Sequence, residues 1–261
     1  MSDTADKSAE QERIQGQRFP HDKEMEKQLQ DFASKHEPSA SDLIHSFPLL
    51  ARRTSLRRFL AHYELFRLTT ELPGDIVEVG VFRGHSLMSF ANFLEIRNMG
   101  DRAKTVWGFD NFAGFTELSA EDGPATPGVD KVKGGYNPSK HLVELQEAIK
   151  IFDKDRFVPF KPRVELVIGD VDQTIPAFIE KQPGLRISLL NLDVDLYKPT
   201  MVALEHFFPR VVSGGVVIFD EYALLDWGGE SQAVEEYLGE RGYTIKRFEW
   251  TSSPGGYLIK R

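Results

Sequence analysis

From about residue 73 to the C-terminus, two patterns of apolar residues alternate along this chain. Short β-branched runs are followed by segments in which apolar residues recur every three or four positions. Runs of the first kind are typical of strands buried on both faces, and segments of the second kind are typical of amphipathic helices. Strands that alternate with helices predict a mostly parallel, doubly wound α/β sheet. We expect its parallel strands at 76–79, 105–109, 164–168, 187–192 and 216–219.

Two further stretches, 243–250 and 256–260, are joined by Ser-Ser-Pro-Gly and predict a closing antiparallel hairpin. The hairpin brings the predicted sheet to seven strands.

The part of the chain before residue 73 has a different pattern. Residues 1–38 are polar and charged, which predicts a flexible segment in which 23–35 could form a helix on binding. Residues 39–72 contain two apolar helical patterns, 43–50 and 55–70. These N-terminal helices could pack on the sheet, cover the ligand as a lid, or contact a second subunit. We therefore expect one catalytic or binding domain, 73–261, preceded by these two segments.

Composition narrows the class of protein. The 261 residues are 41% hydrophobic and 28% charged, with a net charge of −8, so nucleic acid and anionic membranes are unfavourable partners. No apolar run has the length of a membrane span, and no signal-peptide core begins the sequence. Zero cysteines exclude disulfides and thiolate catalysis. These features fit a cytoplasmic enzyme.

The stretch from Gly74 to Ser86 is the first candidate site. Gly80 and Gly84 bracket a turn between the first predicted strand and a helix that begins near Ser86. Such a turn presents backbone N–H groups to a ligand at the carboxyl end of the first strand. Glu78 lies inside the buried strand, where an unpaired carboxylate is costly, so a ligand amine or a basic side chain is expected beside it. A glycine turn without a ligand is the alternative.

The second predicted strand ends in Asp110, the place where an acid binds ribose hydroxyls in nucleotide-binding α/β folds. Residues 111–136, which we call the flap, are rich in Gly and Pro and begin with aromatic residues. Because a loop of this length is usually functional, we expect the flap to face the substrate, with Lys131 and Lys133 available to a diphosphate.

Acidic residues follow the fourth and fifth predicted strands, at Asp193, Asp195, Asp220 and Glu221. Because neighbouring parallel strands lie about 4.8 Å apart, acids at their carboxyl ends converge. A hard cation such as Mg²⁺ would relieve their repulsion. Helix capping, or pairing with Lys198 and Arg210, is the alternative.

Together these stretches resemble S-adenosylmethionine-dependent methyltransferases of the doubly wound type. More narrowly, Leu-Asp-x-Asp-Leu-Tyr-x-x-Thr followed by Gly-Gly-x-Val-Ile-x-Asp-Glu-Tyr resembles the macrocin O-methyltransferase family, from about Asp75 to the C-terminus. That family methylates sugar hydroxyls in natural-product biosynthesis with Mg²⁺. Glu221 stands where the family usually has aspartate, and Val194 where it commonly has glycine.

The resemblance implies a role for each candidate residue. S-Adenosylmethionine would contact Glu78, Gly80, Gly84, Ser86, Asp110 and Asp170. Mg²⁺ would be held by Asp193, Asp220 and Glu221. Asp193 could also accept the proton of the acceptor hydroxyl. By residue type alone, and not by the resemblance, His141, which follows the flap, is the best histidine for that task.

The expected function is therefore Mg²⁺-dependent methylation of a deoxysugar hydroxyl, on a nucleotide-linked sugar such as a dTDP-deoxyhexose or on a glycoside, by a homodimer or higher oligomer. A catechol-type O-methyltransferase is the first alternative, although Leu196 stands where those enzymes keep a lysine. An NAD-dependent oxidoreductase would share Asp110 but does not need the later acids. A non-enzymatic binding module is the last alternative.

Overall fold

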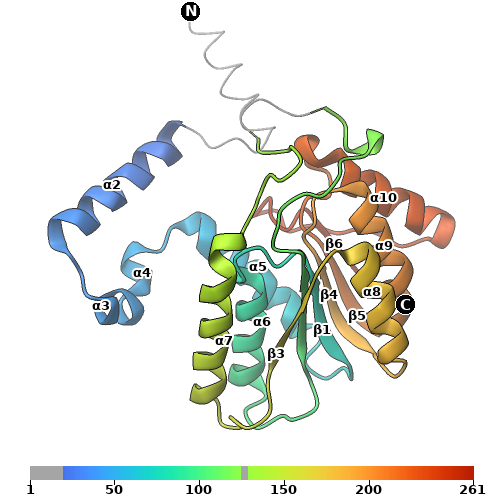
Figure 1. The fold of residues 1–261 in the computed structure, drawn as a ribbon, viewed down its shortest axis with the longest axis horizontal. Helices are drawn as coiled ribbons and strands as arrows, with labels where there is room; N and C mark the ends of the chain where they lie inside the picture. The colour runs from blue at the N-terminus through green and yellow to red at the C-terminus, as the bar shows by residue number, and fades with distance from the viewer. Residues whose placement is uncertain (1–19, 125–128) are drawn as a thin grey trace, which may run out of the picture.

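The computed structural model describes residues 20–124 and 129–261. Its centre is a six-stranded sheet of order β3-β2-β1-β4-β5-β6, in which only β6 is antiparallel (Figure 1). The strands are β1 (Asp75–Val79), β2 (Val106–Asp110), β3 (Val164–Ile168), β4 (Ile187–Leu192), β5 (Val211–Phe219) and β6 (Gly256–Ile259). The doubly wound α/β prediction is confirmed, and the five parallel strands overlap the predicted apolar runs, although β5 begins earlier, at Val211 instead of Val216.

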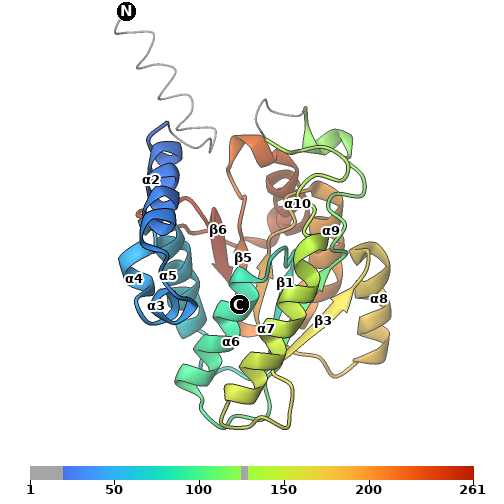
Figure 2. The same cartoon turned by 60° about the vertical axis from the view of Figure 1, so that its left-hand side comes forward.

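Helices cover both faces of the sheet (Figures 1 and 2). One face carries α5 (Arg53–Arg67), α6 (His85–Arg97) and α7 (Leu142–Asp155). The other face carries α8 (Val171–Lys181), α9 (Tyr197–Phe207) and α10 (Gly228–Leu238). Each strand therefore contributes alternate side chains to two cores. In β1, Val77 and Val79 pack toward α8–α10, while Ile76 packs toward α5–α7. The same alternation turns Glu78 toward α6.

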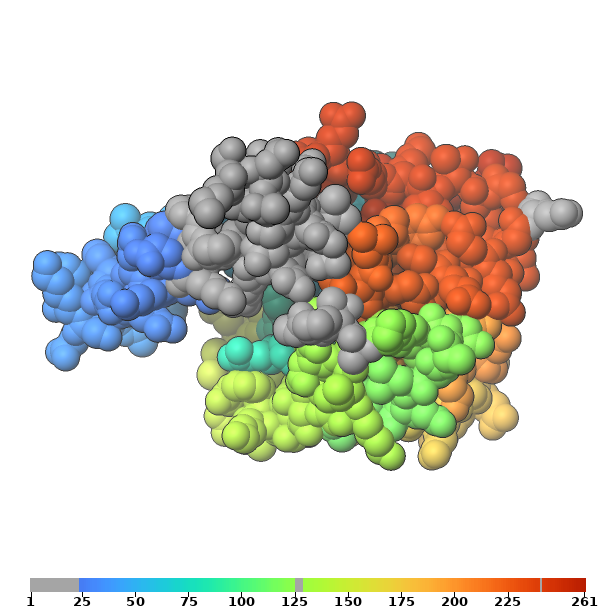
Figure 3. All heavy atoms as spheres, turned by 90° about the horizontal axis from the view of Figure 1, so that it is seen from above, coloured from blue at the N-terminus to red at the C-terminus, as the bar shows by residue number. Residues whose placement is uncertain are grey.

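The N-terminal helices project from this body. The N-terminal arm consists of α2 (Pro20–His36), α3 (Ala40–His45) and α4 (Phe47–Leu50), and Figure 3 shows it to one side of the sheet domain. The segment 20–36 is thus helical, residues 37–38 belong to no helix or strand, and residues 1–19 of the predicted flexible segment lie outside the described residues. Helix α5 is part of the sheet domain, because its side chains Ala61, Leu65 and Phe66 are buried in the core of that domain.

The prediction of seven strands is wrong. Residues 243–250 form no strand, and only one bridge joins Lys246 to Tyr257 of β6. The chain turns at 249–250 before a ladder can extend. Phe248 packs its ring on that of Tyr257 at 5.4 Å instead, so side-chain packing replaces backbone pairing. Among the described residues, no helix combines the length and hydropathy needed to cross a membrane.

Candidate active site

A cavity of about 400 Å³ opens at the carboxyl ends of the parallel strands. Its walls come from the turns after β1 to β5, from the flap, and from α5. This is where ligands bind in open α/β sheets. The cavity has two halves, which we call the cofactor half, beside β1–β3, and the acidic half, beside β4–β5.

Gly80 fixes the floor of the cofactor half. It has φ of +90°, and a Cβ at this position would lie 1.8 Å from the backbone oxygen of Asp193. The turn after β1 therefore touches the end of β4 without an intervening side chain. Only glycine allows both this conformation and this approach.

Glu78 lies below the cavity, fully buried. Its Oε1 accepts hydrogen bonds from the Ser86 hydroxyl and from Asn191 Nδ2, the latter at 2.9 Å, while its Oε2 is buried without a partner. Burial raises the pKa of Glu78 to about 7, although the two hydrogen bonds oppose the shift. The expectation of a cationic neighbour is not met by a direct ion pair, since neutral groups support this carboxyl. The Oε2 atom therefore keeps its capacity to accept a hydrogen bond.

Asp110 braces the glycine turn. Its Oδ2 accepts hydrogen bonds from the backbone N–H groups of Val81 and Phe82, both at 2.8 Å, and its Oδ1 accepts one from Phe112 at 2.6 Å. Asp110 also lines the cavity. Since each carboxylate oxygen has two lone pairs, Oδ1 retains one for a ligand hydroxyl.

The other predicted cofactor residues either line the cavity or lie behind its wall. Asp170 lines the cavity and caps α8, where its side chain accepts a hydrogen bond from the Asp172 N–H. Gly84 begins α6 with φ of +81°, and Ser86 is buried against Glu78. Of the six predicted residues, the cavity wall includes Gly80, Asp110 and Asp170. Glu78, Gly84 and Ser86 lie behind it.

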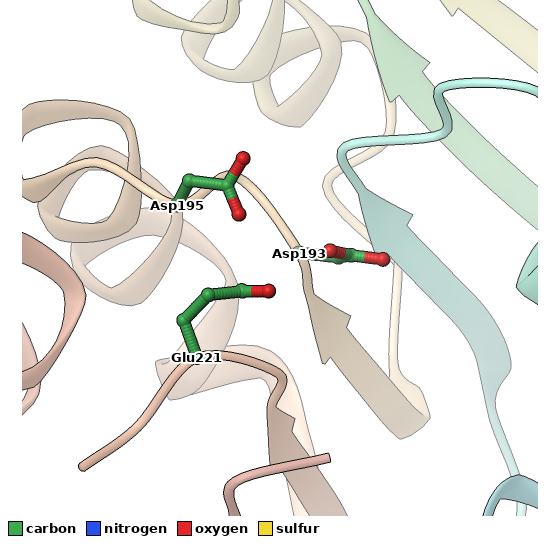
Figure 4. A group of neighbouring side chains, drawn as sticks. All are labelled: Asp193, Asp195 and Glu221. Carbon is green, nitrogen blue, oxygen red and sulfur yellow. The ribbon is translucent and has the colours of Figure 1, made fainter. Parts of the chain in front are cut away.

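Three carboxylates meet in the acidic half. Oxygens of Asp193, Asp195 and Glu221 lie within 4.8 Å of one another, and we call these residues the carboxylate cluster. Figure 4 shows Asp195 and Glu221 entering the same space from the loop after β4 and the turn after β5. Asp195 has φ of +65°, and the Leu196 N–H donates to the Val194 oxygen at 2.6 Å across it. This tight γ-turn directs the Asp195 side chain into the cluster.

Asp220 is oriented differently from the metal-binding role that the sequence predicts. Its carboxylate pairs with Arg58 of α5 at 3.0 Å and accepts hydrogen bonds from Ser253 Oγ at 2.9 and 3.1 Å. Arg58 also pairs with Asp193. The structure therefore groups Asp195 with Asp193 and Glu221, and places a guanidinium between Asp193 and Asp220.

The electrostatics of this half follow from burial and like charge. Burial raises the pKa of Asp195 to about 7 and raises that of Glu221 well above its usual value. Burial also opposes the charge of Arg58, but Asp220 and Asp193 outweigh it and raise the Arg58 pKa. Glu221 has a buried Oε2 without a partner. An oxygen-only set with an unpartnered carboxylate oxygen fits a hard cation such as Mg²⁺.

Hydrogen bonds from Lys131, a residue of the flap, hold the flap in place. Lys131 is buried, and its ammonium donates to the backbone oxygens of Asp122 and Asp226, the latter at 2.8 Å. It also lies 5.4 Å from the ring centre of Trp227. The expectation that Lys131 is available to a diphosphate is therefore wrong for this conformation. Lys133 is exposed.

The flap places aromatic rings over the cavity. Phe115, Tyr136 and Trp227 contact one another with centroids 5.5–5.9 Å apart, and all three line the cavity. The flap is also joined to the acidic half at the start of α9, because Asp122 Oδ1 accepts a hydrogen bond from the Tyr197 N–H at 2.7 Å.

His141 lies apart from these groups. Its Nδ1 is 2.8 Å from Glu144 Oε2 at the start of α7, and it is not part of the cavity wall. From the sequence, Asp195 is recognisable as an acid without a predicted role, and Arg58 is not recognisable as a site residue. The Asp-x-Asp spacing is a signal for Asp195, whereas Arg58 is 135 residues from Asp193 and its sequence context gives no signal.

Most of the chain matches a known protein family. The model of the macrocin-O-methyltransferase family matches residues 8–252. The chain belongs to this family. The resemblance stated from the sequence motifs is thereby confirmed.

Individual relatives support the family assignment. The chain is 33% identical over 175 residues to a tetracenomycin rhamnosyl 4′-O-methyltransferase of Streptomyces olivaceus, covering 67% of this chain and 62% of the relative. It is 29% identical over 185 residues to mycinamicin III 3″-O-methyltransferase of Micromonospora griseorubida, covering 70% and 67%. The chain thus spans about two thirds of the length of these relatives.

Among solved structures, the calicheamicin methyltransferase CalS11 superposes with a TM-score of 0.86 at 27% identity, covering 93% of each chain. The apo structure of the same enzyme, described as a TDP-rhamnose 3′-O-methyltransferase, gives 0.78 at 28% identity, covering 93% of this chain and 95% of that one.

Proposed function

We propose that this protein transfers the methyl group of S-adenosylmethionine to a hydroxyl of a deoxysugar, with Mg²⁺ in the acidic half. The observation that carries the proposal is the adjacency of the two halves of one cavity, joined where Gly80 touches Asp193. A methyl donor bound on one side and a hydroxyl bound on the other would be held together for in-line transfer.

The cofactor half supports the donor assignment. The ammonium of the methionyl group would contact Glu78, the ribose hydroxyls would contact Asp110, and the adenine would lie near Asp170. Glu78 has an oxygen without a partner, and Asp110 and Asp170 line the cavity. Gly80, with Gly84 and Ser86 behind it, leaves space for the donor beside the backbone.

The carboxylates support the metal assignment. Asp193, Asp220 and Glu221 would hold the cation, as the family resemblance implies, and Asp220 joins them once its contact with Arg58 is released. A bound Mg²⁺ lowers the pKa of a hydroxyl that it binds. Of the two groups expected to accept the proton, Asp193 is paired with Arg58 and His141 lies outside the cavity wall. We therefore assign the proton to Asp195, which faces Asp193 and Glu221.

The acceptor proposal rests on the aromatic wall and on the relatives. Phe115, Tyr136 and Trp227 offer apolar ring faces beside the acidic half, and the apolar face of a hexose can be buried against such rings. Two of the proteins named above are described by a rhamnosyl group on tetracenomycin and by TDP-rhamnose. We propose a deoxyhexose with neighbouring hydroxyls, with the nucleotide-linked form ahead of the glycoside.

Two experiments test these assignments separately. Binding of S-adenosylhomocysteine but not NAD, measured by calorimetry, tests the donor site. Turnover of a panel of dTDP-deoxysugars, macrolide glycosides and catechols tests the acceptor, and turnover of catechols alone would exclude the sugar.

A third experiment tests the metal. EDTA should abolish turnover, Mg²⁺ should restore it, and cofactor binding should persist throughout. The Asp195→Asn variant should lose turnover while it still binds Mn²⁺, whereas Asp193→Asn should lose both. Full activity after rigorous chelation would exclude the Mg²⁺ assignment.

We also propose that the N-terminal arm contacts a second copy of the chain. Leu43, Ile44, Phe47 and Leu49 are 43–75% exposed on it. Contiguous apolar exposure of this kind marks interaction surfaces. Light scattering should find a dimer or larger assembly, and deletion of residues 1–40 should raise the KM for the acceptor more than the Kd of the cofactor.

A further inference from the structure

Arg58 is a positively charged side chain that the fold places in the acidic half. Its guanidinium pairs with Asp193 and, at 3.0 Å, with Asp220, and the side chain lines the cavity. These two carboxylates come from the ends of β4 and β5, on neighbouring strands. Arg58 therefore holds together two of the three carboxylates that the proposed metal requires.

The position of this guanidinium is fixed by packing. Helix α5 is anchored to α6 through Ala61, Leu65 and Phe66, all of which are buried. One turn after Arg58, His62 is fully buried against Phe90 at a centroid distance of 5.2 Å. The Arg58 side chain leaves this rigid helix toward the cavity, and its Nε is buried without a partner. Helix α5 lies between the arm and α6 in Figure 2.

His62 does not add to the positive charge that α5 brings. Burial, and then the charge of Arg58, lower the pKa of His62 to about 3, so its ring is neutral at physiological pH. Arg58 is consequently the charged group of α5 that faces Asp193 and Asp220. A divalent cation that binds the same two carboxylates meets a like charge at contact distance.

We propose that Arg58 is a positioning residue that competes with the divalent cation for Asp193 and Asp220. The proposal rests on the proposed Mg²⁺ dependence. Without the metal, the guanidinium pairs with both carboxylates and keeps them at the cavity wall. When the metal binds, at least one of the carboxylates exchanges its guanidinium partner for the cation. The apparent metal affinity is thereby set below what the carboxylates alone would give.

The sign of the effect follows from charge. Removing Arg58 deletes a competing cation and leaves two unneutralised carboxylates, and both changes favour a divalent ion. Charges a few ångströms apart near a protein surface interact strongly enough to change a binding constant by tenfold or more. An arginine that merely supported the fold would produce the opposite result, since its loss would disorder the carboxylates and weaken metal binding.

The first test measures Mn²⁺ affinity by electron paramagnetic resonance, with S-adenosylhomocysteine saturating and no acceptor present. Arg58→Met, which keeps an apolar stem but no charge, should bind Mn²⁺ at least about tenfold more tightly than the wild type. Arg58→Lys keeps the charge and should stay near the wild-type affinity. Arg57→Gln is the matched control, because it removes an exposed charge from the same helix and should change nothing.

The outcomes separate the two proposals. Tighter binding in Arg58→Met supports the inference, including the case in which only that variant binds measurably. Unchanged or weaker binding overturns the inference while the Mg²⁺ proposal stands. If neither the wild type nor any variant binds Mn²⁺, the Mg²⁺ proposal fails and the inference fails with it.

A second measurement follows the unmodified chain, and a variant serves only to assign one signal. The ¹⁵Nε–H signal of Arg58, assigned by its absence from Arg58→Lys, should shift when Mg²⁺ is titrated into the wild type. The other arginine signals serve as internal controls. An Arg58 signal that stays in place while Mg²⁺ saturates the protein would overturn the exchange of partners.

Discussion

The two halves of the cavity are stabilised by different interactions. In the cofactor half, Asp110 is satisfied by backbone N–H groups and Glu78 by a hydroxyl and an amide. In the acidic half, Asp193 and Asp220 depend on one guanidinium, and Glu221 keeps a buried oxygen without a partner. The first arrangement uses neutral hydrogen-bond donors, whereas the second gathers several carboxylates around one guanidinium. The proposed function assigns the methyl donor to the first arrangement and the cation to the second.

The largest expected effect comes from Gly80, where the two halves touch. In Gly80→Ala, the new Cβ would lie 1.8 Å from the Asp193 oxygen in a backbone conformation that disfavours a side chain. We expect a loss of about 3 kcal/mol or more in the free energy of unfolding, measured by urea denaturation.

Gly184→Ala is the control for Gly80→Ala, since nothing lies within 4 Å of a Cβ at that position. It should leave the unfolding free energy within about 0.5–1 kcal/mol of the wild type. Equal stability of the two variants would show that the turn after β1 and the end of β4 are not in contact.

The next effect isolates the cofactor half. Asp110→Ala removes the acceptor of three backbone N–H groups and the proposed ribose contact. We expect the Kd of S-adenosylhomocysteine to rise by about 10- to 100-fold, or about 1–3 kcal/mol, by calorimetry. Mn²⁺ affinity in the acidic half should stay near wild type. The exposed Asp155→Ala at the end of α7 is the control. A matching loss of Mn²⁺ affinity would argue against two separable halves.

These two predictions use residues that the sequence could identify. The buried strand β1 and Gly80 lie within one strand–turn–helix unit, and Asp110 ends the next strand, so local pattern is sufficient to place them. Asp195 was recognised only as an acid, because a γ-turn decides where its carboxylate points, and such a turn has no strong sequence signal. The His141 assignment rested on residue type alone.

Arg58 and Lys131 could not be placed from the sequence. Arg58 meets Asp193 only after α5 packs on α6, and Lys131 meets Asp226, 95 residues away, only after the flap folds. Before folding, each is one basic residue among 32. The apolar pattern of 243–250 indicated buried packing, and Phe248 does pack on Tyr257. It also indicated a strand, and this was wrong, because the segment forms no ladder of backbone hydrogen bonds.

A smaller effect should distinguish the role of the flap from the roles of the two halves of the cavity. Lys131→Met removes the ammonium that joins the Asp122 and Asp226 oxygens beneath Trp227. Because the aromatic wall then loses its support, we expect the acceptor KM to rise by about tenfold, equivalent to about 1.4 kcal/mol, with little change in cofactor Kd. Lys133→Met, exposed on the same flap, should behave as the wild type. If Lys133→Met raised the acceptor KM and Lys131→Met did not, the exposed lysine would be the one that contacts the acceptor.

The smallest effect is the pH dependence of cofactor binding, which tests whether Glu78 meets the ammonium of the cofactor. Burial raises the pKa of Glu78 from its ordinary value of 4.5 to about 7, so the cofactor-free folded protein holds a proton that the unfolded chain releases. This group therefore contributes stability that is fully present below pH 4.5 and is lost as the pH rises through 7.

An ammonium prefers the ionised carboxylate, so binding the cofactor expels that proton and becomes more favourable as the pH rises. With a pKa near 7, the ionised fraction, and with it the affinity for S-adenosylhomocysteine, should increase about threefold between pH 6.5 and 7.5. Calorimetry in two buffers of different ionisation enthalpy should detect the released proton, and Glu78→Gln should abolish both the release and the slope. A wild-type affinity that is flat across this interval, with no proton released, would mean that the ammonium binds elsewhere and that Glu78 only supports Ser86 and Asn191.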